Sequence, residues 1–260
     1  LTPDGSLLVP SSRDGSASET AGVLWQPFRT SGPYGRAAAQ YRKQFSLNAY
    51  DLGSIGGAVG WRQGRGGTFT VGEYDYDFFT LGNARYLSAH RLTAEAHWRA
   101  AEAVSLTFTA FARFESFLQD QTADYSGLRL SAEAELAVHP TSDVTAACRY
   151  HGAHDDTRAP FLTYWEHGPT CRSWWVINER GRLFVEAGAT FRRYATPDPL
   201  LAVDRRDWFL DGLAGADWDL GSHWTLRLVG TGRKATSTVA DYAYRRFSVT
   251  AGALYRWAAP

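Results

Sequence analysis

Residues 247–257 read Phe-Ser-Val-Thr-Ala-Gly-Ala-Leu-Tyr-Arg-Trp, and this segment decides the fold class. Its odd-numbered positions, from Phe247 to Trp257, are all apolar or aromatic, whereas the even-numbered positions are mostly polar or small. A β-strand points successive side chains to opposite faces of a sheet. The segment therefore predicts a strand with one face toward lipid and the other toward a polar lumen.

The same alternation recurs along the chain between turn signals, which is the sequence pattern of outer-membrane β-barrels. Short turns alternate with longer polar links, as short periplasmic turns alternate with longer extracellular loops in outer-membrane barrels. The short turns lie at 64–67, 101–102, 140–141, 179–181 and 221–222. The predicted strands cover residues 18–29, 36–46, 53–64, 68–81, 87–100, 103–118, 126–139, 142–154, 160–178, 182–195, 207–219, 223–237 and 245–257.

We expect an all-β fold, an antiparallel transmembrane β-barrel of about 14 strands, with about 12 or 16 as alternatives, because bacterial barrels have even strand numbers. The missing partner would come from residues 1–10, which contain Leu7, Leu8 and Val9, or from upstream sequence. Residues 1–17 are interpreted as an N-terminal segment, a partial strand or a linker, and residues 18–260 as the barrel. The chain begins at Leu1 and contains no Met, so we interpret it as a mature protein or a fragment of a longer one.

A soluble β-sandwich or lipocalin-like barrel is the competing interpretation, because period two alone does not distinguish it. Alanine-rich strand centres flanked by some of the 10 Trp, 13 Tyr and 14 Phe residues favour lipid. The sequence contains no run of about 18 apolar residues, so it predicts no transmembrane helix. The expected location is therefore the bacterial outer membrane, with outer-membrane lipid and lipopolysaccharide as partners.

Charged residues are predicted to face the lumen, where both signs are interspersed. A pore selective for one ion sign would carry a ring of that sign, so the mixture indicates a structured interior or a non-selective passage. The predicted lumen-facing charges are Arg62, Arg91, Glu95, Arg99, Arg113, Glu115, Arg129, Glu133, Glu135, Arg172, Glu186, Arg192, Asp211, Asp217, Arg227 and Arg256.

Aromatic residues near the strand ends of the apolar face are predicted to form two interfacial girdles. Within residues 74–79 the alternation breaks down, and we interpret this stretch as girdle too, with Asp75 and Asp77 at an extracellular strand end; an aromatic sugar-binding platform is the alternative. The predicted lipid-facing and girdle residues are Trp98, Trp208, Trp218, Trp224, Phe247, Tyr255 and Trp257.

Cys148 and Cys171 fall on successive predicted strands and on the lipid face. A disulfide and two separate small side chains are both compatible with this placement. Their unequal offsets from a loop centred near residue 158 favour separate side chains.

Catalytic chemistry has little support in the sequence. No metal motif, phosphate-binding loop or nucleophile elbow is present, so we expect no metal and no cofactor. His90 and Ser116 both face outward on neighbouring predicted strands, which leaves a lipid hydrolase as a minor alternative. The 27 basic and 27 acidic residues cancel, which gives no nucleic-acid footprint. We expect a protein that is not an enzyme.

Three parts of the sequence resemble the C-terminal barrels of outer-membrane proteins with upstream tetratricopeptide repeats. They are the hairpin series, the segment Tyr74 to His97 and the closing strand Phe247 to Trp257. Surface-lipoprotein assembly modifiers and polysaccharide exporters have this arrangement. The resemblance covers residues 18–257 and implies a transport or export channel, or the outer-membrane component of an envelope-spanning machine with periplasmic protein partners. A structural anchor with a plugged lumen is the alternative. No repeat helices occur in this chain.

Overall fold

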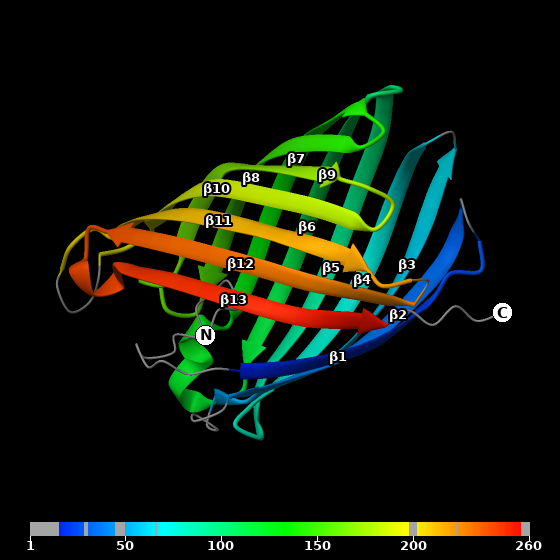
Figure 1. Ribbon diagram of the computed structural model, residues 1–260. Coiled ribbons are helices and arrows are strands. Elements are labelled where there is room, and N and C mark those ends of the chain that lie inside the picture. Colours follow the sequence, from blue (N-terminus) through cyan, green and yellow to red (C-terminus); the bar gives the residue numbers. More distant parts are fainter. Residues whose placement is uncertain are drawn as a thin grey trace. The chain divides into compact units, whose positions relative to one another are not determined.

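A computed structural model describes residues 16–28, 31–44, 50–65, 67–197, 202–221 and 223–255. In this part of the chain, strands β1 to β13 form one antiparallel sheet whose hydrogen-bonded order follows the sequence (Figure 1). The strands are β1 (Ser16–Trp25), β2 (Gly32–Gln44), β3 (Leu52–Arg65), β4 (Thr68–Leu81), β5 (Ala84–Ala101), β6 (Val104–Phe117), β7 (Gly127–Thr141), β8 (Val144–Thr157), β9 (Tyr164–Val176), β10 (Gly181–Tyr194), β11 (Arg206–Asp219), β12 (Trp224–Ser237) and β13 (Tyr244–Tyr255).

The all-β prediction and the order of the thirteen strands are confirmed, and β4 has the predicted bounds. The remaining strand ends differ from the predicted ends by a few residues. No hydrogen-bonded pairing between β1 and β13 occurs in the described residues, so the sheet is open between its first and last strands. Residues 1–15, Arg256 and Trp257 lie outside the described residues.

Connections alternate in length along the sheet. Short turns join β3 to β4, β5 to β6, β7 to β8, β9 to β10 and β11 to β12; we call these strand ends the short-turn end. The opposite ends are called the long-loop end, and their described residues include the short helices η2 (Asp120–Tyr125) and η3 (Ala240–Tyr242). One connection at the long-loop end is itself tight. Gly82 and Asn83 join β4 to β5 with φ of 55° and 66°, the positive angles that a two-residue hairpin turn requires.

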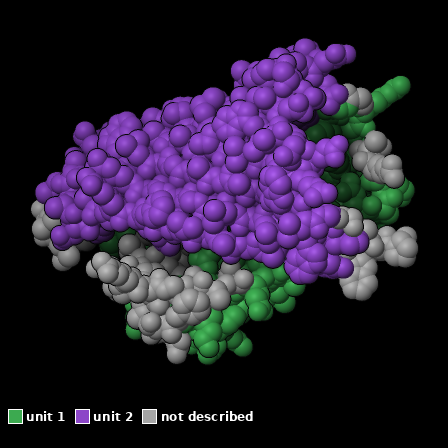
Figure 2. Space-filling view, viewed as in Figure 1, with its two compact units in different colours: residues 1–96, 109–131, 154–163 green, residues 97–108, 132–153, 164–260 purple. Residues whose placement is uncertain are grey.

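The chain divides into two compact units (Figure 2). Unit 1 comprises residues 1–96, 109–131 and 154–163, and unit 2 comprises residues 97–108, 132–153 and 164–260. In unit 1, Tyr86, Leu87 and Phe117 form a small buried cluster at the long-loop end, with Tyr125 of η2 packed against it. The other side chains lie on two faces of the sheet. These two faces constitute the candidate functional site.

Candidate functional site

One face of the sheet presents large aromatic and aliphatic side chains to its surroundings, and we call it the aromatic face. In unit 2, β9 carries Trp165 and Trp175 near its two ends, 62% and 37% exposed, and β11 carries Trp208 and Trp218, 53% and 46% exposed. Each pair is separated by ten residues. At about 3.3 Å per residue and a strand tilt of about 40°, this spacing corresponds to a band about 25 Å tall, the height of the apolar band of outer-membrane barrels.

Between Trp208 and Trp218, the aromatic face of β11 carries only small or aliphatic side chains, from Leu210 to Ala216. A solvent-facing strand of the same length would be expected to carry charges or hydroxyls at these positions. An exposed apolar surface of this kind marks an interaction site for a membrane or a partner.

The predicted girdle residues lie on the aromatic face wherever the structure describes them. They are exposed large side chains of unit 2: Trp98, Trp208, Trp218, Trp224, Phe247 and Tyr255. Unit 1 adds exposed aromatic residues on this face that the prediction did not name. Trp25 and Trp61 lie near the short-turn end, and Tyr74 and Phe114 lie toward the long-loop end.

Two tyrosine–histidine pairs also lie on the aromatic face. In unit 1, the Tyr74 hydroxyl is 2.7 Å from Nδ1 of His90, and in unit 2 the Tyr150 hydroxyl is 2.6 Å from Nδ1 of His167. The structure thus joins His90 to a tyrosine, and no hydrogen bond between His90 and Ser116 occurs among the described residues. A serine nucleophile requires a base within hydrogen-bond reach, so this geometry gives the hydrolase alternative no support.

The opposite face, which we call the charged face, carries ion pairs. In unit 1, Asp75 of β4 is 4% exposed and lies between Arg36 and Arg91. Arg36 also binds Glu73 at 2.8 Å. The interpretation of Asp75 as a residue at an extracellular strand end was therefore wrong: it lies within β4, on the charged face. Aromatic residues at both odd and even positions of 74–79 obscured the period-two pattern.

A second group of charges in unit 1 lies toward the long-loop end. Arg113 binds Glu115 at 2.9 Å, and Arg129 approaches Asp155 at 3.8 Å. Both carboxylates are at most 10% exposed, whereas their arginines are more accessible. The charges of this group are thus neutralised within the group.

Unit 2 also pairs charges from different strands, and one of these pairs spans two strands, β7 and β9. Arg172 of β9 donates to both carboxylate oxygens of Glu135, at 2.9 and 2.7 Å. Further pairs on the charged face are Arg149–Glu133, Arg182–Asp219, Arg227–Asp217 and Arg233–Asp211.

The most buried charges of unit 2 lie at the long-loop end. Arg192 and Glu166 are 6% and 5% exposed, and Nη2 of Arg192 is 2.7 Å from Glu166. The Arg192 guanidinium lies 3.9 Å from the ring centre of Tyr164 and 4.9 Å from that of Phe209. These stacking and ionic contacts fill this part of the charged face with protein side chains.

An adjacent pair extends this arrangement. Arg205 binds Asp207 at 2.7 Å and lies 3.3 Å from the ring centre of Tyr242. Asp207 is 1% exposed. Arg205 also stacks on Tyr194, at 4.1 Å from its ring centre.

Every described member of the predicted lumen-facing set occupies a strand position of the charged face. The ion pairs include Arg91, Arg113, Glu115, Arg129, Glu133, Glu135, Arg172, Arg192, Asp211, Asp217 and Arg227. Arg62 instead stacks on Phe69, 3.8 Å from its ring centre. Glu95 and Glu186 form no ion pair with any described residue. Nδ1 of His97, in the row of Glu95 and Arg99, is 3.0 Å from the Thr107 hydroxyl.

The predicted set left out further charged residues that form ion pairs on this face. The missed partners include Arg36, Glu73, Arg149, Asp155, Glu166, Arg182, Asp207 and Arg233. Strand parity would have identified most of them. Asp207, for example, occupies the same alternate positions as Asp211 and Asp217.

Cys148 and Cys171 form a disulfide on the aromatic face of unit 2, with Cα atoms 4.0 Å apart. The expectation of separate side chains was wrong because it placed the hairpin centre near residue 158. The Val176 N–H donates to the Asp143 carbonyl at 2.8 Å, which sets the centre between Ala159 and Pro160. The two cysteines are equally far from that point and lie directly opposite each other.

Replacing both cysteines by serine is expected to lower the free energy of unfolding by about 3 kcal/mol, because the bond closes a loop with a sequence separation of 23 residues. Urea titration of the reconstituted protein, with and without prior reduction, measures the loss. The matched control is the serine double variant itself, whose stability should not respond to reductant. The expectation would be contradicted if wild-type protein that had been reduced while unfolded, and then refolded, kept the same free energy of unfolding.

No group of three His, Cys, Asp or Glu side chains within the described ranges converges as a metal-binding site. None of the helices among the described residues is long and apolar enough to cross a membrane. In comparisons with known proteins, the chain matches no protein-family model and no curated protein.

Proposed function

We propose that this chain is an integral β-barrel of the bacterial outer membrane, with the aromatic face toward lipid and the charged face toward the lumen. The observation that carries the proposal is the pair of tryptophans on each of β9 and β11, ten residues apart, with an apolar stretch between those of β11. Indole rings at that spacing fit the two interfaces of an outer membrane.

Closure of the sheet follows from the same proposal. Unpaired backbone groups at a sheet edge are too costly to expose to hydrocarbon. Because each strand is antiparallel to the next, β1 and β13 run in the same direction. One more strand between them would give a fully antiparallel barrel of about 14 strands.

Within such a barrel, the charged face supports a transport or export passage without strong preference for ion sign. Most of its charges are paired locally, so the described residues form no ring of one sign. Export through a larger envelope-spanning machine is the specific role that the resemblance to repeat-containing barrel proteins implies.

A membrane anchor with a blocked interior is the second candidate. Buried side chains that fill space at the long-loop end of unit 2 favour this anchor. They are Arg192, Glu166, Asp207 and Tyr164.

Single-channel recording in planar bilayers tests the passage. The wild-type protein should give conductance steps with a reversal potential near zero in a salt gradient. Glu95→Lys and Glu186→Lys each add positive charge to the charged face without breaking an ion pair, and should shift the reversal potential toward anion preference. Glu179→Lys, in the β9–β10 turn, is the control and should leave it unchanged. A silent bilayer with verified insertion would favour the anchor.

A further inference from the structure

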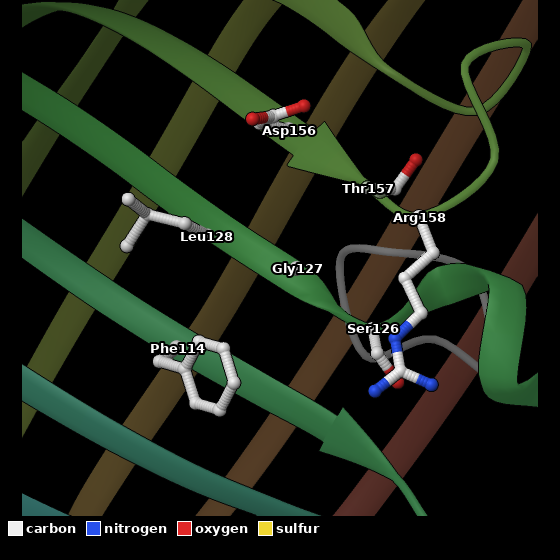
Figure 3. A pocket seen from close by; sticks show the side chains of 7 residues that line it. All are labelled: Phe114, Ser126, Gly127, Leu128, Asp156, Thr157 and Arg158. Atoms are coloured by element: carbon white, nitrogen blue, oxygen red, sulfur yellow. The ribbon is translucent and has the colours of Figure 1, made fainter.

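A pocket of about 270 Å³ lies in unit 1 where β6, β7 and β8 end at the long loops (Figure 3). It is lined by Phe114, Ser126, Gly127, Leu128, Asp156, Thr157 and Arg158. Phe114 and Leu128 are exposed on the aromatic face, at 51% and 40%. The pocket therefore joins an apolar floor to the polar chain ends above it.

The backbone that carries the pocket is held by buried contacts. The Ser126 hydroxyl, in a residue 2% exposed, accepts the Phe117 N–H at 2.9 Å, and the Ser126 carbonyl accepts the Arg158 N–H at 2.9 Å. Thr157 is fixed in the same way, because its N–H donates to the Thr163 hydroxyl at 3.1 Å. The pocket residues are thus positioned by local structure before any ligand binds.

Gly127 shows how closely the strands approach here. A Cβ at this position would overlap the carbonyl group of Asp156 on β8. Only glycine allows β7 and β8 to meet at this depth, and the close approach brings Asp156 and Arg158 beside the apolar floor.

Two opposite charges in the pocket have no ion-pair partner among the described residues. Figure 3 shows the Arg158 side chain running from the end of β8 over Ser126, whereas Asp156 points away from it. Both residues are exposed, and neither forms an ion pair with the other or with any other described residue. On the charged faces of the two units, by contrast, most acidic groups are paired with an arginine.

We infer that this pocket binds a zwitterionic phospholipid headgroup of the phosphoethanolamine class. The Arg158 guanidinium would bind the phosphate through charge-assisted hydrogen bonds, the Asp156 carboxylate would accept from the primary ammonium, and Leu128 and Phe114 would contact an acyl chain. A site with one cation, one anion and an apolar floor matches an amphiphile that carries the same two charges. This inference rests on the proposed membrane location.

The experiment uses the full chain in nanodiscs that contain phosphatidylethanolamine, phosphatidylcholine and phosphatidylglycerol in equal amounts. Native mass spectrometry then identifies the lipid retained after release from the disc. Phosphatidylethanolamine should be enriched about tenfold, because choline lacks the donors that Asp156 accepts and glycerol lacks the cation; tenfold corresponds to one charge-assisted hydrogen bond. Soluble phosphoethanolamine at the same concentration should not compete, since it lacks the acyl chain.

Two variants separate the roles of the charges. Arg158→Gln should remove retention of all three phospholipids, whereas Asp156→Asn should keep retention but lose the preference for the ethanolamine lipid. Lys234→Gln, which removes an exposed cation from the aromatic face of β12, is the matched control and should behave as wild type.

The outcomes distinguish this inference from the membrane assignment. A wild-type protein that inserts and is heat-modifiable but retains no lipid selectively, or retains it equally in both variants, would overturn the pocket assignment alone. Preferential retention of phosphatidylglycerol would overturn the role of Asp156. A chain that does not insert into lipid at all would overturn the proposed function and the inference with it.

Discussion

Replacing Val249 by Arg is expected to lower the free energy of unfolding in lipid by about 2–4 kcal/mol, the cost of a cation on the lipid face near the bilayer midplane. Val249 is at the middle of β13 and is 62% exposed on the aromatic face, opposite Gly230 of β12. The loss would reduce the folded fraction in membranes by one to three orders of magnitude near the midpoint of denaturation. Urea titration in phospholipid vesicles and heat-modifiability on gels measure it.

Thr250→Arg is the matched control. Thr250 is the next residue, is also exposed, and points to the other face of the same strand. Neither side chain lies in a packed core, so the two variants differ only in the face of β13 on which the arginine lies. We expect the Thr250 variant to lose less than about 1 kcal/mol, as a lumen position tolerates charge. Equal losses, or a larger loss at Thr250, would reverse the assignment of the two faces.

Replacing Glu166 by Leu is expected to cost about 3–5 kcal/mol, because it leaves Arg192 as a buried cation without its carboxylate. The two side chains are 5% and 7% exposed, and two guanidinium nitrogens, Nε and Nη2, donate to one oxygen of Glu166 at 3.0 and 2.7 Å. Arg192→Leu should cost a similar amount for the opposite reason. Chemical denaturation of each variant, reconstituted in the same lipid, gives the values.

The double variant Glu166→Leu, Arg192→Leu should recover most of the loss, because no unpaired charge remains in the buried site. Arg182→Leu provides the comparison at an accessible pair, whose arginine and carboxylate are 39% and 26% exposed, and should cost less than about 1 kcal/mol. The idea fails if the double variant is as unstable as either single variant.

The period-two pattern predicted the strands well because it depends only on the chain itself. Successive residues of a strand point to opposite faces, so the alternation from Trp208 to Trp218 already places Leu210 with the tryptophans and Asp211 against them. Turn residues between the segments then located the strand ends to within a few residues. The pattern was obscured at residues 74–79, where aromatic side chains occupy both faces of β4.

The period-two pattern did not predict the register in which neighbouring strands pair. The sequence placed Cys148 and Cys171 on one face, but whether they meet depends on the register of β8 and β9, and a small error in the hairpin centre separates them. The pocket at Arg158 depends on the same kind of information. Its residues come from three strand ends that are close only because β7 and β8 approach at Gly127.

By itself, the sequence determined the all-β class, the order of the strands and the face on which most strand residues lie, because each of these follows from local alternation. Only the tertiary structure decided which charges neutralise each other, as Arg172 with Glu135 and Arg192 with Glu166. It also decided that Asp75 lies between two arginines from other strands. The physical reason is that an ion pair is a contact of a few ångströms, and its formation depends on strand register and side-chain direction, which the sequence pattern of a single strand does not contain.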